Sequence, residues 1–432
     1  MRDGDTIVAL SSGSVPSGVA VIRLSGPASG PVLEAMLGAL PQPRRLLLAE
    51  IGLDGRLFDR GLVAWFPGPH SFTGEDCAEL QVHGSPAVVR GLLRALAARP
   101  GLRLAEAGEF TRRAFESGKL DLTEVEGLGD LIEAETEAQR QQAFARMSGQ
   151  LSAQLESWRE RLLDARAEIE AQLDFSDEGD VGELPAHFAG SLRSLLRELE
   201  GAIETVGRGR IIREGLRVAL AGPPNVGKSS LLNALAKSDV AIVTDEPGTT
   251  RDVREVAVDL GGQLVILVDM AGLRDTDSKA EAEGVRRARA EIAQADLVLW
   301  LRAPDVPDVR PEARAAPVWR LATKADLGAA AGVVDMSIST HSGQGLAELL
   351  ERLADFAAAT TAGEAPLLSR ERDLAALQAA HGSLGEALGR LDDPEIAAES
   401  LRRATHALER LLGRMDAEAV LDRLFSAFCI GK

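Results

Sequence analysis

Short runs of apolar and β-branched residues, bounded by glycine, serine and proline, characterise the first part of the chain. Such runs, which are typical of strands, occur at residues 7–9, 19–24 and 62–66. Stretches with helical spacing lie between them, at residues 31–40 and 87–98. The pattern predicts a strand-rich N-terminal domain of mixed α and β structure over residues 1–118.

Beyond residue 121 the apolar residues recur every three or four positions, which is the stripe of an amphipathic helix. Thr123 and Glu126 have the spacing of a capping box that opens such a helix. Two long helices are predicted by the sets Leu151, Leu155, Trp158, Leu162, Ile169, Leu173 and Leu192, Leu195, Leu199, Ile203, Val206. The same stripe returns later, so two helical segments, 119–212 and 362–432, are expected.

The pattern changes between these two helical segments. Apolar runs of the kind found in buried strands occur at residues 216–221, 265–268, 297–301 and 318–322. Helical stretches separate some of them, and this βαβ alternation predicts a parallel sheet. Because helical sequence lies on both sides, we expect a multidomain chain in which an α/β domain, residues 213–361, is inserted into an all-helical domain.

Composition limits the classes of function. The 432 residues carry a net charge of −18, so the chain is not a bulk electrostatic binder of nucleic acid. Its two cysteines, Cys77 and Cys429, form neither a disulfide framework nor a zinc-binding pattern. No apolar run is long enough to cross a bilayer, and the N-terminal residues lack the features of a signal peptide. We therefore expect a cytoplasmic protein without a membrane partner.

A phosphate-binding loop follows the first strand of the α/β domain. Residues 222–229, GPPNVGKS, fit the pattern G-x-x-x-x-G-K-[ST] and precede an apolar helix. The flanking strand and helix favour this interpretation over an ordinary glycine-rich turn. Lys228 would bind the β- and γ-phosphates, and the Ser229 hydroxyl would bind Mg²⁺. The loop residues expected to bind nucleotide are Asn225, Val226, Gly227, Lys228, Ser229 and Ser230.

Two further segments indicate a GTPase. Residues 269–272, DMAG, fit the D-x-x-G element, in which the aspartate reaches Mg²⁺ through water and the glycine N–H meets the γ-phosphate. Residues 248–252, GTTRD, have the place of a switch loop, where Thr250 would complete the Mg²⁺ shell, although a polar turn is the alternative. Nucleotide contacts are expected from Thr244, Asp245, Glu246, Pro247, Gly248, Thr249, Thr250, Asp269, Met270, Ala271 and Gly272.

Guanine would be recognised by residues 323–326, TKAD, which are similar to the N-K-x-D element. Asp326 would accept hydrogen bonds from the guanine N1 and amino groups, and the Lys324 stem would cover the ring. Thr323 replaces asparagine and lacks the carboxamide that steadies both base and loop, so weaker affinity is expected. The base-binding set comprises Thr323, Lys324, Ala325 and Asp326, with Ser339, Thr340 and His341 from a later loop.

The position after the D-x-x-G element differs from that of Ras-like GTPases, which place glutamine there to orient water. Here the residue is Leu273, so another group must orient water or hydrolysis is slow. The charged stretch 274–284 contains Asp275, Asp277, Glu281 and Glu283. From the residues alone, each of these is better interpreted as a solvated loop charge than as a catalyst.

Sequence blocks along nearly the whole chain resemble the MnmE (TrmE) family of tRNA modification GTPases. The blocks are residues 5–9 (DTIVA), 21–26 (VIRLSG), 71–76 (SFTGED), 79–84 (ELQVHG), 108–111 (GEFT), 118–122 (GKLDL) and 428–432 (FCIGK), together with the nucleotide motifs. The resemblance implies an N-terminal α+β domain that binds a tetrahydrofolate derivative, formyl or methylene, and forms the homodimer contact. It also implies a helical domain that carries the inserted GTPase domain.

The same resemblance implies a reaction and a partner. With the flavoprotein MnmG (GidA), the family adds an aminomethyl or carboxymethylaminomethyl group to C5 of the wobble uridine of certain tRNAs. The folate contacts would be Arg23, Glu79, Lys119 and Lys432. Without the surrounding blocks, each of these would be interpreted as a surface charge. Cys429 is either a buried apolar residue or a thiol near the one-carbon centre, and the sequence leaves both open.

The resemblance also accounts for Leu273, because the family hydrolyses GTP when two GTPase domains meet around a potassium ion. It implies that potassium is held by Asn225, Thr244, Glu246 and Thr249, and that Glu281 organises the attacking water, with Lys228 stabilising the transition state. Three alternatives remain: a ribosome-assembly GTPase, a folate-dependent aminomethyltransferase with a structural GTPase domain, and a scaffold that binds GTP without hydrolysing it.

Overall fold

The computed structural model describes residues 4–174, 184–185, 187–242, 255–269, 295–307, 316–330, 332–415, 418–428 and 430–431. The chain divides into two compact units. The first combines residues 1–129 with residues 409–432, and the second comprises residues 130–408. The finer division predicted at residues 118, 212 and 361 stays a prediction.

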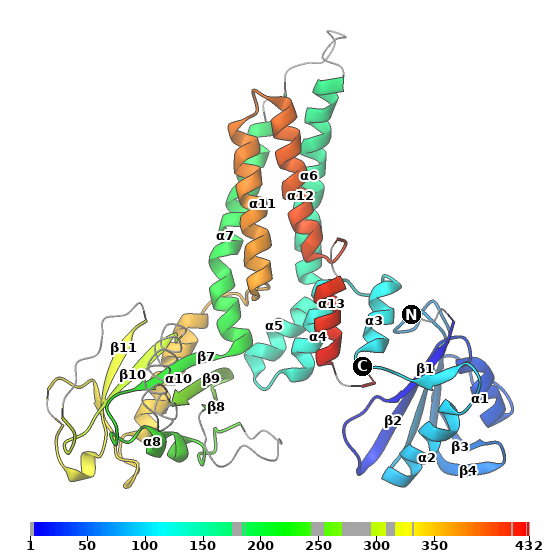
Figure 1. Ribbon diagram of the computed structural model, residues 1–432, viewed down its shortest axis with the longest axis horizontal. Helices are drawn as coiled ribbons and strands as arrows, with labels where there is room; N and C mark the ends of the chain where they lie inside the picture. Colours follow the sequence, from blue (N-terminus) through cyan, green and yellow to red (C-terminus); the bar gives the residue numbers. More distant parts are fainter. Residues whose placement is uncertain are drawn as a thin grey trace, which may run out of the picture. The chain divides into compact units, whose positions relative to one another are not determined.

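A six-stranded sheet forms the centre of the first unit (Figure 1). Its strand order is β3(Leu47–Leu53), β4(Arg56–Phe66), β5(Cys77–Gly84), β2(Ser17–Ser25), β1(Thr6–Leu10) and β6(Leu102–Leu104). All neighbours are antiparallel except β1 and β6. The three predicted runs lie in β1, β2 and β4.

The two faces of this sheet carry different chemistry. One face packs against α1(Ser29–Leu37) and α2(Pro86–Ala97), and together they form a core of aliphatic side chains. The opposite face has a smaller apolar cluster, made by Ile7, Ala9, Ala105 and Phe110. Phe110 belongs to α3(Glu109–Glu116). Because side chains alternate along a strand, the polar residues Arg23 and Ser25 of β2 lie on the same face as each other.

The C-terminal segment of the chain packs onto this first unit. Helix α13(Glu418–Ala427) contacts α3, where the Arg112 guanidinium lies 3.0 Å from Asp422 Oδ1 and stacks on the Phe425 ring. Ile430 forms a β-bridge with Ala107, and the Ser11 hydroxyl donates to Gly431 O at 2.6 Å. Segments from the two ends of the sequence are therefore joined in one unit.

Helix α4(Leu122–Glu133) begins differently from the predicted capping box. The Asp121 carboxylate accepts from the Thr123 and Glu124 amides, at 2.8 and 3.0 Å, and the Glu124 carboxylate accepts from the Asp121 amide. The cap is thus the pair Asp121 and Glu124, and the assignment to Thr123 and Glu126 was wrong. Thr123 and Glu126 both lie within the helix, which already begins at Leu122, and both are buried.

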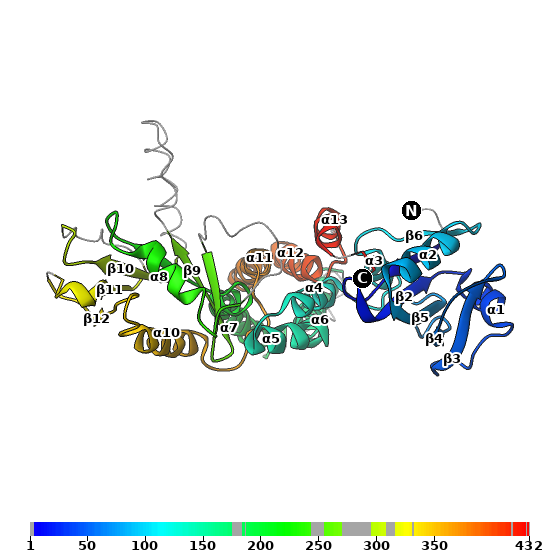
Figure 2. The same cartoon turned by 90° about the horizontal axis from the view of Figure 1, so that it is seen from below.

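The second unit contains long helices and an α/β domain. The helices are α5(Glu137–Met147), α6(Gln150–Asp174), α7(Phe188–Glu214), α11(Glu371–Gly389) and α12(Pro394–Leu411). The predicted apolar stripes of α6 and α7 are buried, except that Leu173 and Ile203 are half-buried. Helices α7 and α11 pack side by side, as both views show (Figures 1 and 2), although 156 residues of sequence separate their facing ends, Glu214 and Glu371. The α/β domain lies between them in sequence, so the predicted insertion is confirmed.

The inserted domain has a second six-stranded sheet. The order is β12(Met336–Ser337), β11(Val318–Ala322), β10(Leu297–Arg302), β7(Leu216–Ala221), β9(Gln263–Asp269) and β8(Glu255–Leu260). Helices α8(Lys228–Leu235) and α10(Leu346–Thr361) share one core with the sheet. Strands β12 to β9 are parallel as predicted, whereas β8 is antiparallel to β9. Gly261 and Gly262, both with positive φ, close that hairpin, and the Gly-Gly pair was the signal for it.

Helix α5 joins the inserted domain to the helices. Its Ala138 amide donates to Gly262 O at 3.0 Å, and its Gln142 side chain donates to Pro366 O at 2.7 Å. Its Arg146 guanidinium reaches Leu367 O at 2.7 Å and the Asp373 carboxylate at 3.2 Å. Both side chains of that ion pair are 0% exposed. Burial alone would raise the pKa of Asp373, but Arg146 and neighbouring donors hold that pKa below its ordinary value.

None of the helices that the structure describes is long and apolar enough to span a membrane.

We predict that Arg146→Met destabilises the second unit by about 3–5 kcal/mol, because it removes the buried cation nearest the Asp373 carboxylate. The Arg372 guanidinium, 3.8 Å from that carboxylate, is more distant and more exposed. Urea unfolding followed by tryptophan fluorescence measures this, since Trp158, Trp300 and Trp319 all lie in that unit. Arg140→Met is the matched control on the same helix. Arg140 pairs with Glu137 at the surface, so its removal leaves the unfolding midpoint unchanged. Equal midpoints for both variants would contradict the prediction.

Candidate functional site

The phosphate loop connects β7 to α8, and its backbone departs from ordinary conformations. Gly222, Asn225 and Gly227 have φ values of +143°, +61° and +101°. A Cβ atom at Gly222 would lie 2.6 Å from Leu301 O, so only glycine fits there. The loop thus turns sharply from the end of the strand into the N-terminus of α8, the geometry that aims backbone N–H groups at an anion.

Two side chains at the start of α8 hold the chemistry of this loop. The Lys228 ammonium lies 2.8 Å from Gly222 O and 2.9 Å from Pro223 O, and the residue is only 6% exposed. The Ser229 hydroxyl donates to Asp269 Oδ2 at 2.7 Å. Strands β7 and β9 are neighbours with Leu220 opposite Asp269, and this register brings the carboxylate to the loop.

Ser229 and Asp269 offer a hydroxyl and a carboxylate oxygen at one point. Oxygen ligands of this kind are those that Mg²⁺ prefers, usually together with waters and substrate phosphates. The residues present therefore fit the expected magnesium ion. The structure brings together the two predicted residues, which are 40 positions apart in sequence.

Thr323 is buried between three segments of the α/β domain. The Thr323 hydroxyl donates to Val226 O of the phosphate loop at 2.5 Å and lies 3.0 Å from Arg302 O. The Thr323 backbone amide also donates to Arg302 O. The side chain is 3% exposed and lies against Gly227. Although threonine has no carboxamide, its hydroxyl contacts the phosphate loop directly. The expected weaker affinity for guanine nucleotides stays a prediction.

The predicted guanine-reading residues also lie together. The Ser339 hydroxyl donates to Asp326 Oδ1 at 2.5 Å, and the Ala325 amide donates to Ile338 O at 3.1 Å. The hydrogen bond from Ser339 holds the pKa of Asp326 below its ordinary value, so this exposed carboxylate is ionised at neutral pH. Lys324 has a positive φ of 54° and pairs with Asp305 at 2.6 Å. Thr340 and His341 follow Ser339 in the same turn.

A second group of candidate residues lies on the polar face of the first unit. Arg23 of β2 faces Glu79 of β5 in register, and their charged groups lie 2.8 Å apart. The Arg23 guanidinium also lies over the Phe72 and Phe110 rings, at 5.5 and 5.8 Å. Lys119 is exposed beyond the end of α3. The pair Arg23 and Glu79 thus forms a half-buried charged site with aromatic walls.

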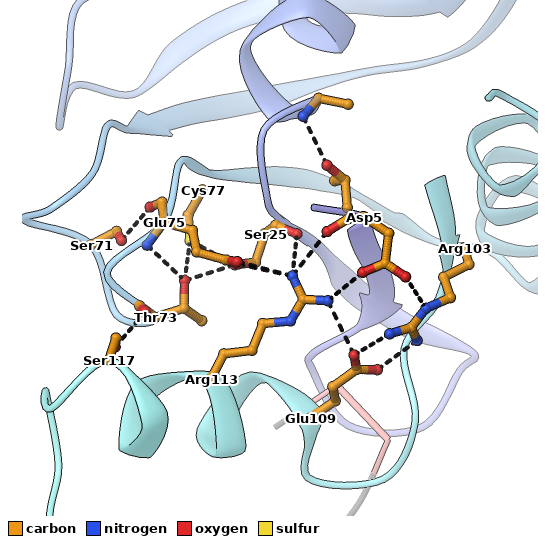
Figure 3. Close-up of polar contacts among 12 residues, drawn as sticks. Asp5, Ser25, Ser71, Thr73, Glu75, Cys77, Arg103, Glu109, Arg113 and Ser117 are labelled. Carbon is orange, nitrogen blue, oxygen red and sulfur yellow. Dashed lines mark hydrogen bonds and ion pairs between the residues drawn. The ribbon is translucent and has the colours of Figure 1, made fainter. Parts of the chain in front are cut away.

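Residues that the motif analysis left without a role form a polar network in the same unit (Figure 3). The Ser25 hydroxyl bonds Thr73 Oγ1 at 2.7 Å and Glu75 Oε2 at 2.6 Å, and Arg113 reaches the same Glu75 carboxylate at 3.0 Å. Thr73 and Glu75 belong to the block SFTGED, which resembles the family without revealing a role for each residue. Their function depends on contacts with distant segments, which the sequence does not display.

Several predicted site residues lie outside the described part of the chain. They are Thr244, Asp245, Glu246, Pro247, Gly248, Thr249, Thr250, Met270, Ala271, Gly272, Glu281, Cys429 and Lys432. Of the potassium ligands, only Asn225 is described, and it is exposed at the tip of the phosphate loop. The roles of these residues stay predictions.

Comparison with known proteins gives consistent matches over the full chain. Residues 6–119 match the family model described as the GTP-binding protein TrmE N-terminus, and residues 122–429 match the MnmE helical domain. The chain is similar to the tRNA modification GTPase MnmE of Rhodopseudomonas palustris, with 49% identity over 99% of both chains. The corresponding protein of Azorhizobium caulinodans is 51% identical over 100% of both chains. That of Brucella canis is 50% identical over 99% of this chain and 98% of its own.

We predict that Thr323→Val weakens binding of GTP and GDP about fivefold, because one buried hydrogen bond contributes about 1 kcal/mol. Valine has nearly the shape of threonine but cannot donate to Val226 O. Thr323→Ser keeps the hydroxyl and should bind nucleotide as the unchanged protein does. Fluorescent guanine nucleotides measure both affinities by titration. Wild-type affinity in the valine variant would show that the hydroxyl does not order the loop.

Proposed function

The chain belongs to the MnmE (TrmE) family of tRNA modification GTPases, and we propose that it hydrolyses GTP to drive modification of the wobble uridine in certain tRNAs. The observation that carries the proposal is the meeting of Ser229 and Asp269 beside Lys228, with Asp326 presented by Ser339 on a neighbouring loop. One set of residues serves the phosphates and the other serves guanine. We also propose that this activity takes place in the cytoplasm.

Each described residue has a definite part in this proposal. Lys228 neutralises the β- and γ-phosphates, and the N–H groups at the start of α8 hold their oxygens. Ser229 and Asp269, with Thr250, would hold Mg²⁺, which neutralises charge as the γ-phosphate is transferred to water. Asp326 accepts the two guanine N–H groups, which adenine does not present in that arrangement. Hydrolysis then removes the γ-phosphate that orders the switch segments.

Because residue 273 is leucine, the protein has no glutamine at the position where Ras-like GTPases orient the attacking water. Another group must therefore promote hydrolysis. We propose that potassium, held by Asn225, Thr244, Glu246 and Thr249 when two GTPase domains meet, supplies positive charge at the phosphates. Glu281 then organises the water. A cation beside the β- and γ-phosphates stabilises transition-state charge as an arginine finger does. The exposed position of Asn225 at the loop tip supports this role, because a second domain can approach it.

A homodimer through the N-terminal domain is supported by an exposed apolar edge. Strand β3 lies at the edge of its sheet, and Leu46, Leu47 and Leu48 have exposures of 58%, 43% and 57%. Exposed apolar edge strands are a liability in a monomer, and pairing with a second copy removes it. Leu57 of the neighbouring strand β4 is also exposed, at 59%, near the other end of β3, where it pairs with Gly52.

The modification chemistry would use the polar face of the first unit. We propose that Arg23, Glu79, Lys119 and Lys432 bind a formyl- or methylene-tetrahydrofolate, and that MnmG supplies the flavin. The cations suit the glutamate tail of a folate, and carboxylates suit its ring N–H groups. Since the net charge is −18, the tRNA is held mainly by the partner protein. Cys429 would act on the one-carbon unit or serve as an apolar contact.

We predict that GTP hydrolysis is at least tenfold faster in potassium chloride than in sodium chloride at equal ionic strength. The reason is that potassium, held where two GTPase domains meet, would supply the positive charge that stabilises the transition state. Phosphate release under multiple turnover measures the rate, and Lys228→Ala is the control, which should be inactive in both salts. Equal and negligible rates for the unchanged protein would favour a scaffold that binds GTP without hydrolysing it.

We predict that cells lacking the gene lose aminomethyl and carboxymethylaminomethyl groups from wobble uridines. Mass spectrometry of tRNA nucleosides measures this, and complementation with the unchanged gene restores the groups. A Lys228→Ala gene should fail to complement if hydrolysis is required, which separates this function from a folate-dependent transferase with a structural GTPase domain. Unchanged wobble uridines in the deletion strain would remove the tRNA modification proposal, and defective ribosome assembly there would favour that alternative.

A further inference from the structure

The segment 71–76 of the first unit is fastened to the sheet and to α3 by polar side chains (Figure 3). The Ser25 hydroxyl reaches Thr73 and Glu75, and the Ser117 hydroxyl donates to Thr73 O at 2.7 Å. The Gly68 amide donates to Asp76 Oδ1 at 2.9 Å, and the Gly26 amide donates to Asp76 O at 2.9 Å. This loop is therefore held by contacts outside itself.

Arg113 of α3 is the largest of these anchors. Its Nη1 lies 3.0 Å from Glu75 Oε2 and 3.0 Å from Asp5 O, and its Nη2 lies 2.9 Å from Asp5 Oδ1 and 3.1 Å from Glu109 Oε1. The side chain is 9% exposed. A planar guanidinium can join three acidic residues in this way, whereas an ammonium has a different geometry.

Arg103 binds two of the same carboxylates but does not bind the loop. Its Nε lies 2.5 Å from Asp5 Oδ2, and its Nη1 lies 2.8 Å from Glu109 Oε2. Its Nη2 donates to Glu109 Oε1 as well, and its Nη1 also reaches Leu104 O. Arg103 and Arg113 thus share a cluster, and contact with Glu75 distinguishes Arg113. The two arginines form a natural pair of test and control.

The loop carries groups that belong to the proposed folate site. Phe72 lies against the Arg23 guanidinium, as described above. A Cβ atom at Gly74 would meet Ser117 Oγ at 3.0 Å and Lys119 Cε at 3.5 Å, so the loop passes close beside the lysine. A displacement of residues 71–76 would therefore move the aromatic wall of Arg23 and the surroundings of Lys119 together.

We propose that Arg113 is a positioning residue for the folate site, which it serves by fixing the loop 71–76 through Glu75. This inference rests on the proposed function, since it assigns the loop to the folate site. Arg113 itself is buried behind the loop and acts through Glu75, Phe72 and the segment next to Lys119.

The charges in the cluster of Asp5, Glu109, Arg103 and Arg113 stabilise one another. Burial by itself would raise the pKa values of Asp5 and Glu109, but the two guanidiniums outweigh it and hold both pKa values below their ordinary range. Burial would also lower the pKa of Arg113, yet Glu75 and Glu109 keep it above its ordinary value. The charges of Asp5, Glu109 and Arg113 therefore persist across the neutral range.

The test compares Arg113→Lys with Arg103→Lys in the full-length protein. Both keep the positive charge and lose the planar fork, but only the first loses the bridge to Glu75. We expect Arg113→Lys to weaken binding of 5-formyltetrahydrofolate at least tenfold, and Arg103→Lys to bind within about twofold of the unchanged protein. Isothermal titration calorimetry measures the affinities. Equal losses in both variants, or wild-type affinity in Arg113→Lys, would overturn the proposal.

Hydrogen exchange gives a readout that needs no folate. The amides of Gly26, Gly68 and Glu75 report on the loop, and they should exchange at least tenfold faster in Arg113→Lys but not in Arg103→Lys. Glu75→Gln, which changes a partly exposed side chain, should act in the same direction if Arg113→Lys fails to fold. Unchanged exchange at these amides in both Arg113→Lys and Glu75→Gln would overturn the proposal. Absence of folate binding by the unchanged protein would instead remove the folate part of the proposed function.

Discussion

The hydrogen bond between Ser229 and Asp269 depends on β7 and β9 being neighbours in one parallel sheet. Loops that follow parallel strands emerge at the same edge, so residues distant in sequence meet there. The phosphate loop can turn so tightly only because Gly222 takes a backbone conformation that leaves no room for a side chain. Thr323 adds a third segment by bonding Val226 O. The nucleotide site is therefore assembled by strand order.

The insertion of this domain into the helices has a structural consequence. The inserted domain begins after α7 and ends before α11. Helix α5 binds both Pro366, in the segment that leads back to α11, and Gly262, in the β8–β9 hairpin. The buried pair Arg146 and Asp373 closes that junction. Hydrogen bonds and a buried ion pair therefore join the inserted domain to the helices of the same unit.

In the first unit, many charged side chains lie on one face of the sheet. Arg23 and Glu79 pair across two strands, and aromatic rings lie beside them. Behind the loop, Arg103 and Arg113 compensate buried carboxylates. The C-terminal segment belongs to this same unit, where the Ser11 hydroxyl, just after β1, donates to Gly431 O. This arrangement is consistent with the proposed folate chemistry, to which both ends of the sequence would contribute.

The sequence by itself determined the local elements and the motifs whose chemistry lies within a few residues, such as the phosphate loop, because glycine placement and apolar periodicity are local properties. It also predicted the inserted domain, since helical stripes flank the strands. It did not identify the Asp121 cap of α4, the antiparallel β8 or the Thr323 contact with Val226. Nor did it indicate that Arg113 holds Glu75. Those features were decided by tertiary structure, because each depends on which of several capable partners the fold brings within hydrogen-bonding distance.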